Sequence, residues 1–347
     1  MSSPLLPAYN ADTRSPETVQ AYRQRYGQLK RAAMAQLASS FDPSSFVDWV
    51  IDVKRHNWNA STWRQNRAAM KEGLQDEVAS EPGRATQIKR AIERLDQTRP
   101  APSKARAPKT SAKKAKRFAI GDMTRIHHAA LASASPNAQV LADILLATSV
   151  AGLRPIEWRS ATFGPSSVPG FAWEMTVLNA KRNAVRAHGE FRTLRWTGLD
   201  LITVGAIERS IDVAQKAKTA EHYKRKLMTL AAMMRRLTAA LFTSRKKRPT
   251  LYTARHEAIA HWKLHYVETQ STPEGRLNGL AVVAALSGHA SDETATTHYG
   301  RSRRDERAGR GVPQADPSEV ARIRPRMSMT LTRLLDLKAR SIGQRPR

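Results

Sequence analysis

The sequence contains no cysteine. That absence excludes a disulfide scaffold, a thiolate metal site and a cysteine nucleophile. The chain also lacks an apolar run close to the ~20 residues that a membrane span requires. Its first twenty residues are polar, without the continuous apolar stretch of a signal peptide. Nothing in the sequence therefore points to membrane insertion or export.

Acidic residues are scarce relative to basic ones. The chain has 58 Lys and Arg against 30 Asp and Glu, a formal net charge of +28. Such an excess predicts a polyanionic partner, with nucleic acid as the first candidate. Ribosomal and architectural proteins share this balance, so the charge indicates a class of partner and no activity. With 347 residues, 41% of them hydrophobic, the chain is long enough for roughly two domains with buried cores.

A basic segment divides the chain. Residues 101–117, APSKARAPKTSAKKAKR, contain seven basic residues and no acid, a composition that predicts an extended cationic linker. We expect a flexible N-terminus over 1–14 and a helical domain over 15–100 before it. A larger domain over 118–305 follows the linker, and 306–347 should form a basic connector and a C-terminal helix.

The N-terminal domain is predicted to be a small helical bundle with one basic face. PETVQAYRQRYGQLKRAAMAQL is rich in helix-forming residues, and a second helix should begin after Asn59, capped by Ser61 or Thr62. Trp63 is expected in the core rather than against DNA. Arg64, beside it, is a candidate for the basic face.

The C-terminal domain combines helices with a β-hairpin. A buried helix should end at Gly152, and Pro155 suits the first position of the next helix, so Arg154 lies in a tight turn. Two alternating strands then flank a basic turn. Two further helices are predicted over 203–217 and 221–242. A third should begin after Thr253 as its cap, a fourth should end at Gly288, and a fifth should begin at Ser291. The predicted fold class is mainly α with a small β-sheet (α+β).

Phosphoryl transfer by side chains alone needs fixed cations, a nucleophile and a proton donor. Arg154 lies in a rigid turn, and Arg255 shares a helix face with Tyr252, three residues earlier. The hairpin carries Lys181. His289 ends one helix and Tyr299 lies on the next. Each of these residues is commonplace alone, and their order along the chain gives them weight.

The series GLR (152–154), the hairpin lysine, YTARH (252–256), LSGH (286–289) and HYG (298–300) resembles the tyrosine recombinase, or phage integrase, family. The likeness covers nearly the whole chain. It implies that 15–100 is a core-binding, DNA-binding domain and 118–305 the catalytic domain. The implied roles are a phosphate clamp for Arg154 and Arg255, protonation of the leaving 5′ oxygen for Lys181, a hydrogen bond to phosphate for His289, and the nucleophile for Tyr299.

The resemblance also implies a chemistry and a set of partners. Attack by Tyr299 would store the phosphoester energy in a 3′-phosphotyrosyl link, so no metal, ATP or other cofactor is expected. Double-stranded DNA is the expected partner, bound by a homo-tetramer in a synaptic complex; a monomeric free protein and accessory DNA-bending proteins stay open. No membrane partner is expected, and the implied setting is the cytoplasm, on the nucleoid, of a bacterium or its phage. The candidate DNA-contacting cations are Lys113, Lys114, Lys116 and Arg117 in the linker, Arg64, and Arg182 and Arg186 in the hairpin.

Two features depart from the family pattern. Most members have His where this chain has Tyr252. A phenol, with an ordinary pKa of about 10, is a poor general base but can donate a hydrogen bond to phosphate. His256, one position after Arg255, should face about 100° away from it on a helix. The segment between Arg255 and His289 is also long, and a loop around VETQSTPEGRL (267–277) is predicted to take up the extra residues.

Several alternatives stay open. A site-specific integrase is the leading hypothesis, ahead of a hairpin telomere resolvase with the same chemistry and of a DNA-binding relative without catalysis. Tyr223 and Tyr266 are the next candidates for the nucleophile after Tyr299. The amphipathic segment 327–340 could dock on a neighbouring protomer or on its own domain.

Overall fold

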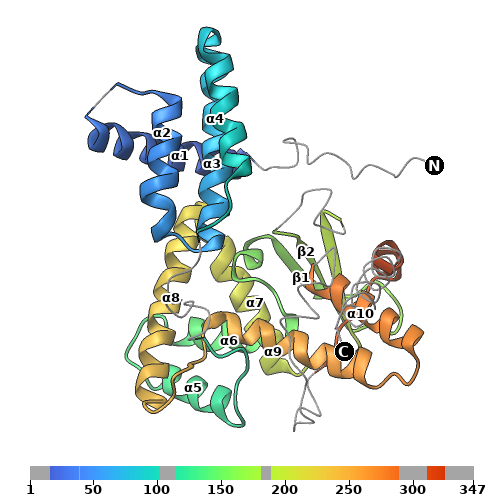
Figure 1. Ribbon diagram of the computed structural model, residues 1–347. Coiled ribbons are helices and arrows are strands. Elements are labelled where there is room, and N and C mark those ends of the chain that lie inside the picture. The colour runs from blue at the N-terminus through green and yellow to red at the C-terminus, as the bar shows by residue number, and fades with distance from the viewer. Residues whose placement is uncertain (1–15, 39, 102–113, 181–188, 289–310, 325–347) are drawn as a thin grey trace, which may run out of the picture. The chain divides into compact units, whose positions relative to one another are not determined.

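A computed structural model describes residues 16–38, 40–101, 114–180, 189–288 and 311–324 (Figure 1). The chain divides into two compact units, 1–108 and 109–347. Each unit has a hydrophobic core of its own.

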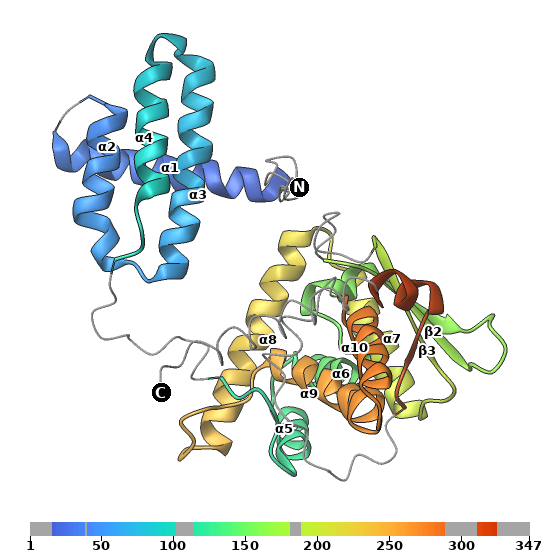
Figure 2. The same cartoon turned by 45° about the vertical axis from the view of Figure 1, so that its right-hand side comes forward.

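The first unit is helical throughout its described part. Its α-helices are α1 (Pro16–Leu37), α2 (Pro43–Trp49), α3 (Ala60–Ser80) and α4 (Ala85–Gln97), joined by the short helical segments η2 (Val50–Lys54), η3 (Arg55–Asn57) and η4 (Pro82–Arg84). Helices α3 and α4 run side by side, and α1 crosses them (Figure 2). The contacting faces of the helices of this unit, α2 included, bury Phe46, Trp63, Leu74, Ile88 and Leu95.

The start of α3 corrects one prediction and confirms another. The N-cap is Asn59, not Ser61 or Thr62. Its side-chain oxygen accepts hydrogen bonds from the backbone amides of those two residues at 3.0 and 2.9 Å, which is why the helix begins two or three residues earlier than expected. Trp63 is 1% exposed, so it belongs to the core as predicted.

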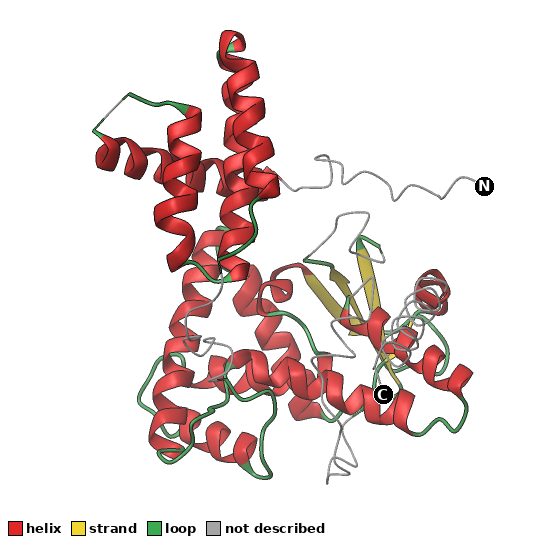
Figure 3. Ribbon diagram, in the orientation of Figure 1, coloured by secondary structure: helices red, strands yellow, loops and turns green. Residues whose placement is uncertain are grey.

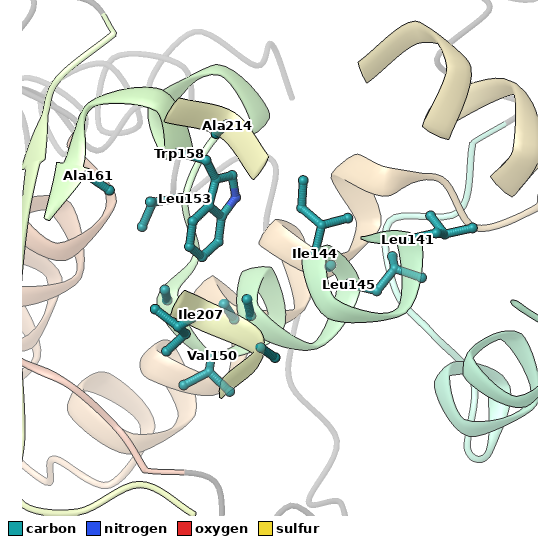
Figure 4. Packing of buried hydrophobic residues seen from close by; sticks show 14 of the residues in the cluster. Leu141, Ile144, Leu145, Val150, Leu153, Trp158, Ala161, Ile207 and Ala214 are labelled. Carbon is teal, nitrogen blue, oxygen red and sulfur yellow. The ribbon is translucent and has the colours of Figure 1, made fainter. Parts of the chain in front are cut away.

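The second unit is built around a central helix. Its helices are α5 (Asp122–Leu131), α6 (Ala138–Ala151), α7 (Leu201–Gln215), α8 (Ala220–Leu241), α9 (Leu251–Lys263) and α10 (Pro273–Ser287), with the shorter η6 (Pro155–Ser160) and η7 (Leu264–Glu268). Helix α6 is buried on nearly every side because α5, α7 and α9 pack around it. Leu141, Ile144 and Leu145 enter that core from α6, while Trp158 lies beside Ala214 of α7 (Figure 4).

A small antiparallel sheet lies at one side of this unit (Figure 3). Its strands are β1 (Ala161–Pro165), β2 (Trp173–Leu178), β3 (Phe191–Trp196) and β4 (Gln314–Ala315), hydrogen-bonded in that order. The predicted hairpin is the β2–β3 pair, in which Trp173 faces Trp196 and Leu178 faces Phe191. The outer strands β1 and β4 were not predicted. The fold class, mainly α with a small sheet, is confirmed.

Two helix boundaries differ from the predictions. Thr250, not Thr253, caps α9; Thr253 stands three residues later and its hydroxyl accepts from the Thr250 amide at 2.8 Å. The predicted loop over 267–277 is mostly helical, because η7 prolongs α9 and α10 already begins at Pro273. Thr272 caps α10 by accepting from the Gly275 amide at 3.0 Å, and proline suits the first helical position.

The end of the predicted linker is attached to the second unit. The Ala115 amide donates to the Arg248 carbonyl at 2.9 Å, and the Thr253 hydroxyl donates to the Ala115 carbonyl at 2.8 Å. Farther along, the Phe118 amide donates to Glu257 at 3.4 Å. Residues 115–118 are thus held against α9, the helix that carries Arg255.

Among the helices of the described segments, none combines the length and the apolar character needed to cross a membrane.

Candidate active site

The turn between α6 and η6 fixes Arg154. Gly152 closes α6 with φ 62°, in the left-handed region that favours glycine. A Cβ at Gly152 would lie 2.3 Å from the indole of Trp262, so no larger residue fits. Pro155 then begins η6 as predicted. Arg154 has an extended backbone conformation and lies between the end of α6 and the start of η6.

Glu157, which the sequence analysis did not single out, organises the charges around Arg154. Its carboxylate accepts from the Arg154 backbone amide at 2.7 Å and from Arg154 Nη1 at 2.6 Å. It also accepts from Arg192 Nη2 at 2.7 Å and from the Ala180 amide at 3.3 Å, and Arg255 Nη1 lies 3.7 Å away. One carboxylate therefore gathers residues from η6, β3, the end of β2 and α9.

The ionisation of Glu157 follows from these neighbours. Burial alone would raise the pKa of its carboxyl group, since the side chain is 0% exposed. The guanidinium groups of Arg192, Arg255 and Arg154 outweigh that effect and hold the pKa well below its usual range. Three arginines and one glutamate leave a formal surplus of two positive charges (3 − 1 = +2) in this part of the described structure.

Arg255 lies inside α9 with a side chain that is 0% exposed. Its Nη1 donates to the Gly152 carbonyl, and its Nη2 donates to the Ser287 carbonyl at 2.7 Å. Burial, and then the neighbouring Arg154, lowers the pKa of this guanidinium, while Glu157 opposes the change. The structure thus brings Arg154 and Arg255 together, with Arg154 (11% exposed) the more open of the two.

Tyr252 occupies the first turn of α9. Tyr252 is 40% exposed, whereas Arg255 on the next turn is buried. Its ring meets that of His256 edge-on, with the centroids 5.1 Å apart. The phenol is therefore open to solvent at the same helix end that positions Arg255.

Other predicted residues lie outside the described residues: Lys181, His289 and Tyr299 of the catalytic set, and Lys113, Arg182 and Arg186 of the DNA-binding set. The described chain leads directly to two of them, Lys181 and His289. Strand β2 ends just before Asn179, two positions from Lys181. Helix α10 ends at the left-handed Gly288, with φ 67°, one position from His289.

The remaining DNA-binding candidates lie at the surface. Arg64 is exposed in the first unit, and Lys114 and Lys116 are exposed at the start of the second. Arg117 is partly buried. Their contact with DNA stays a prediction.

The two alternative nucleophiles are poorly placed. Tyr223 is 1% exposed, and its hydroxyl donates to the Pro155 carbonyl at 3.1 Å. The Tyr266 hydroxyl donates to the Pro313 carbonyl at 2.8 Å, and burial raises the pKa of this phenol to about 12. Both phenols hold the fold together and neither is easily ionised.

Glu157 had a signal in the sequence. It follows Arg154 by three positions and Pro155 by two, the spacing at which an acidic side chain reaches back to the first amide of a helix. Arg192 had none, because it looks like one more basic residue in a basic hairpin.

No family model matches the chain, and no curated protein matches it. The chain is similar to several solved structures, among them the following two. One is a lambda integrase dimer bound to a COC′ core site, with 14% identity, coverage of 85% of this chain and 92% of that chain, and a TM-score of 0.48. The other is a protelomerase TelA variant complexed with a DNA hairpin product, with 13% identity, coverage of 81% and 86%, and a TM-score of 0.41.

Proposed function

We propose that the protein is a site-specific DNA recombinase of the integrase type, which cuts and rejoins DNA strands through a 3′-phosphotyrosyl intermediate. The observation that carries the proposal is the meeting of Arg154 and Arg255 on the buried carboxylate of Glu157. These arginines come from two separate motifs of the resemblance, GLR and YTARH. Their convergence supports the phosphate clamp that the resemblance implies.

The charge balance of this cluster suits a phosphodiester. Guanidinium groups stay protonated and match two phosphate oxygens with their fork of donors. The Glu157 carboxylate fixes the orientation of Arg154 by accepting hydrogen bonds from the Arg154 backbone amide at 2.7 Å and from Arg154 Nη1 at 2.6 Å. Donors fixed in advance cost no reorganisation when negative charge develops on a transferring phosphoryl group. The surplus positive charge would then be offset by the substrate.

The other roles come from the resemblance. Tyr299 is proposed as the nucleophile, Lys181 as the acid for the leaving 5′ oxygen, and His289 as a further phosphate contact. Tyr252, open to solvent beside the arginines, would donate a hydrogen bond to the phosphate. Neither metal nor ATP enters this scheme. Double-stranded DNA is the substrate, and a tetramer would hold two duplexes during exchange.

Covalent trapping tests the proposal. Randomly nicked genomic DNA is incubated with the protein, adducts that resist denaturant are recovered and sequenced, and the site found is rebuilt as a nicked duplex. We expect wild type to form the adduct, and Tyr299→Phe to bind the duplex with unchanged affinity but to form none. Arg154→Ala should lower the adduct yield roughly 10²-fold, the scale for losing one preorganised donor. Tyr22→Phe, the same change in α1, serves as the control.

The products separate the alternatives. Exchange of strands between two duplexes supports an integrase, whereas closed hairpin ends would show a telomere resolvase. Binding without any adduct would leave a DNA-binding relative. If Tyr299→Phe still forms an adduct, Tyr252 becomes the next candidate, ahead of the buried Tyr223 and the partly buried Tyr266.

A further inference from the structure

Arg192 is a buried charge in a strand that otherwise supplies apolar residues to the core. In β3, residues 192, 194 and 196 point to the same face, and all three are 0% exposed. Leu194 and Trp196 belong to the hydrophobic core. Replacing a buried ion pair with apolar residues of similar volume is often neutral or stabilising. Stability alone therefore does not account for an arginine at this position.

The guanidinium of Arg192 binds three separate elements, one with each nitrogen. Nε donates to the Leu286 carbonyl at 3.1 Å, in the last turn of α10. Nη1 donates to Asn179 Oδ1 at 2.6 Å, at the end of β2. Nη2 donates to Glu157 at 2.7 Å, and thereby joins the cluster of Arg154 and Arg255. The planar fork of a guanidinium fixes the directions of such bonds, so these three elements are held in one geometry.

The three elements are also packed tightly where they meet. A Cβ at Gly288 would lie 2.6 Å from Asn179 Oδ1 and 2.8 Å from Arg192 Nη1. Asn179 donates in turn to the Gly189 carbonyl at 2.9 Å, which joins the two ends of the hairpin turn. The end of β2, the end of α10 and the arginine cluster thus share one junction, formed by Arg192, Asn179, Glu157 and the backbone of Leu286.

We propose that Arg192 is a positioning residue, which holds the ends of β2 and α10 in register with the phosphate clamp of Arg154 and Arg255. The proposal rests on the proposed function, because it assigns Arg192 to the same phosphate site. The chain continues from these two ends into Lys181 and His289. On the roles that the resemblance implies for these two residues, a shift at the junction would slow the reaction without removing any group that contacts the phosphate.

Hydrogen exchange tests the junction without relying on catalysis. Arg192→Lys keeps a positive charge but loses the fork, and Asn179→Ala removes one arm at a smaller risk to folding. Both should speed amide exchange about tenfold or more at 179–180, 189–190 and 286–288, with the exchange of α5 and α6 unchanged. Arg195→Lys is the matched control: it lies on the same strand, and its side chain binds Glu174 and Asp316 at 2.6 and 3.0 Å, away from the junction. Unchanged exchange in both junction variants would overturn the proposal.

Single-turnover cleavage of the nicked duplex tests the effect on the reaction. A displacement of about 1 Å can cost roughly 10²-fold in rate, so Arg192→Lys should cleave about 10²-fold more slowly than wild type and bind the duplex equally well. Replacing the bridging 5′ oxygen with sulfur removes the need for an acid. The defect of Asn179→Ala should therefore shrink on that substrate, whereas that of Arg154→Ala should persist.

The outcomes separate this proposal from the proposed function. Equal losses of cleavage in Arg192→Lys and Arg195→Lys would reduce Arg192 to a general structural role and overturn the inference. If the wild-type protein forms no adduct, the proposed function is wrong. The exchange data would still show whether Arg192 holds the ends of β2 and α10.

Discussion

Glu157 shows how one carboxylate can set the properties of a cationic site. Without it, Arg154, Arg192 and Arg255 would repel one another in a region where two of the three side chains are 0% exposed. With it, the guanidinium groups of Arg154 and Arg192 are hydrogen-bonded to one carboxylate, and that of Arg255 lies 3.7 Å from it. A buried carboxylate is stable in this environment because its hydrogen bonds and ion pairs outweigh its desolvation.

Replacing Glu157 by Gln should destabilise the protein strongly. Breaking a buried ion pair by removing one partner costs on the order of 3–5 kcal/mol, and here three guanidinium groups lose the same carboxylate charge. Urea unfolding at pH 7 measures the effect. Glu174→Gln is the control, because its pair with Arg195 is more exposed and should cost about 1 kcal/mol or less.

The pH dependence of this difference has a defined sign. The folded-state pKa of Glu157 is depressed, so its stabilisation is complete above the unfolded value of about 4.3 and is lost as the pH falls toward the folded value. Each pH unit below about 4.3 should remove up to about 1.4 kcal/mol of the gap between wild type and Glu157→Gln. An identical gap at pH 7 and pH 3 would mean that Glu157 is not an ionised partner of the arginines.

At the same scale, the sequence predicted the position of a single residue where neighbouring glycine and proline residues determine the backbone conformation. Arg154 lies in a turn because Gly152 and Pro155 mark both sides of it, and such punctuation is visible without a structure. Arg192 was missed because its importance depends on Leu286 and Asn179, which come close to it through the packing of α10 and the hairpin. A local sequence pattern does not show which residues of distant elements come into contact.

At the scale of elements, alternation and helix periodicity predicted the parts that are amphipathic along their own length. The β2–β3 hairpin is an example, whereas α1 was predicted from its content of helix-forming residues. Strand β1 contains Gly164 and Pro165, which disfavour a strand, and β4 has two residues. Pairing with a preformed neighbour stabilises both, so their own sequences carry little signal. The cap of α9 was misplaced by three residues, because Thr250 and Thr253 are equally suitable by type.

Thr253 gives an element-scale prediction. Its hydroxyl both completes the cap of α9 and holds the Ala115 carbonyl, so it ties the end of the linker to the helix of Arg255. Thr253→Val keeps the shape and loses the bond, which is worth about 1 kcal/mol. Trypsin cleavage after Lys114 and Lys116, followed by mass spectrometry of the released peptides, should become about fivefold faster.

The matched control is Thr229→Val, whose hydroxyl donates to a carbonyl of its own helix at 3.2 Å. That variant should be cut at the wild-type rate. Equal acceleration in the two variants would show that the tie between Thr253 and Ala115 does not restrain the end of the linker.

At the scale of the whole molecule, the chain consists of two units with separate cores and a strong excess of positive charge. Composition gives the charge excess directly, because charge is a sum that requires no knowledge of contacts, while the expectation of two domains rested on the chain length and the basic linker. Composition could not predict which cations are already neutralised. Arg23 binds Asp76 through two nitrogens, and Lys71 binds Asp96 at 2.5 Å, so these side chains have acidic partners within the first unit.

The salt dependence of DNA binding shows which cations contact phosphates. Each phosphate neutralised by a protein cation adds about 0.9 to the negative slope of log K against log salt. Replacing Lys113, Lys114, Lys116 and Arg117 together by Ala should weaken binding to all sequences and flatten the slope by up to about 3.6 if all four contact phosphates. An unchanged slope would remove this end of the linker from the DNA interface.

The control for that measurement is the double replacement of Arg23 and Lys71 by Ala. Because both cations already have a carboxylate partner, they should release few counterions from DNA, and the slope should change by well under the ~1.8 expected of two phosphate contacts. The comparison is made by titrating a labelled duplex at several salt concentrations, with Arg64→Ala as a single-contact reference expected to change the slope by about 0.9. The decrease in slope is divided by the number of charges that each variant removes. An equal decrease per charge in the linker variant and in the Arg23 and Lys71 double variant would mean that binding responds to net charge alone. A slope that falls in the linker variant and hardly changes in the control would mean that residues 113–117 follow the phosphate backbone.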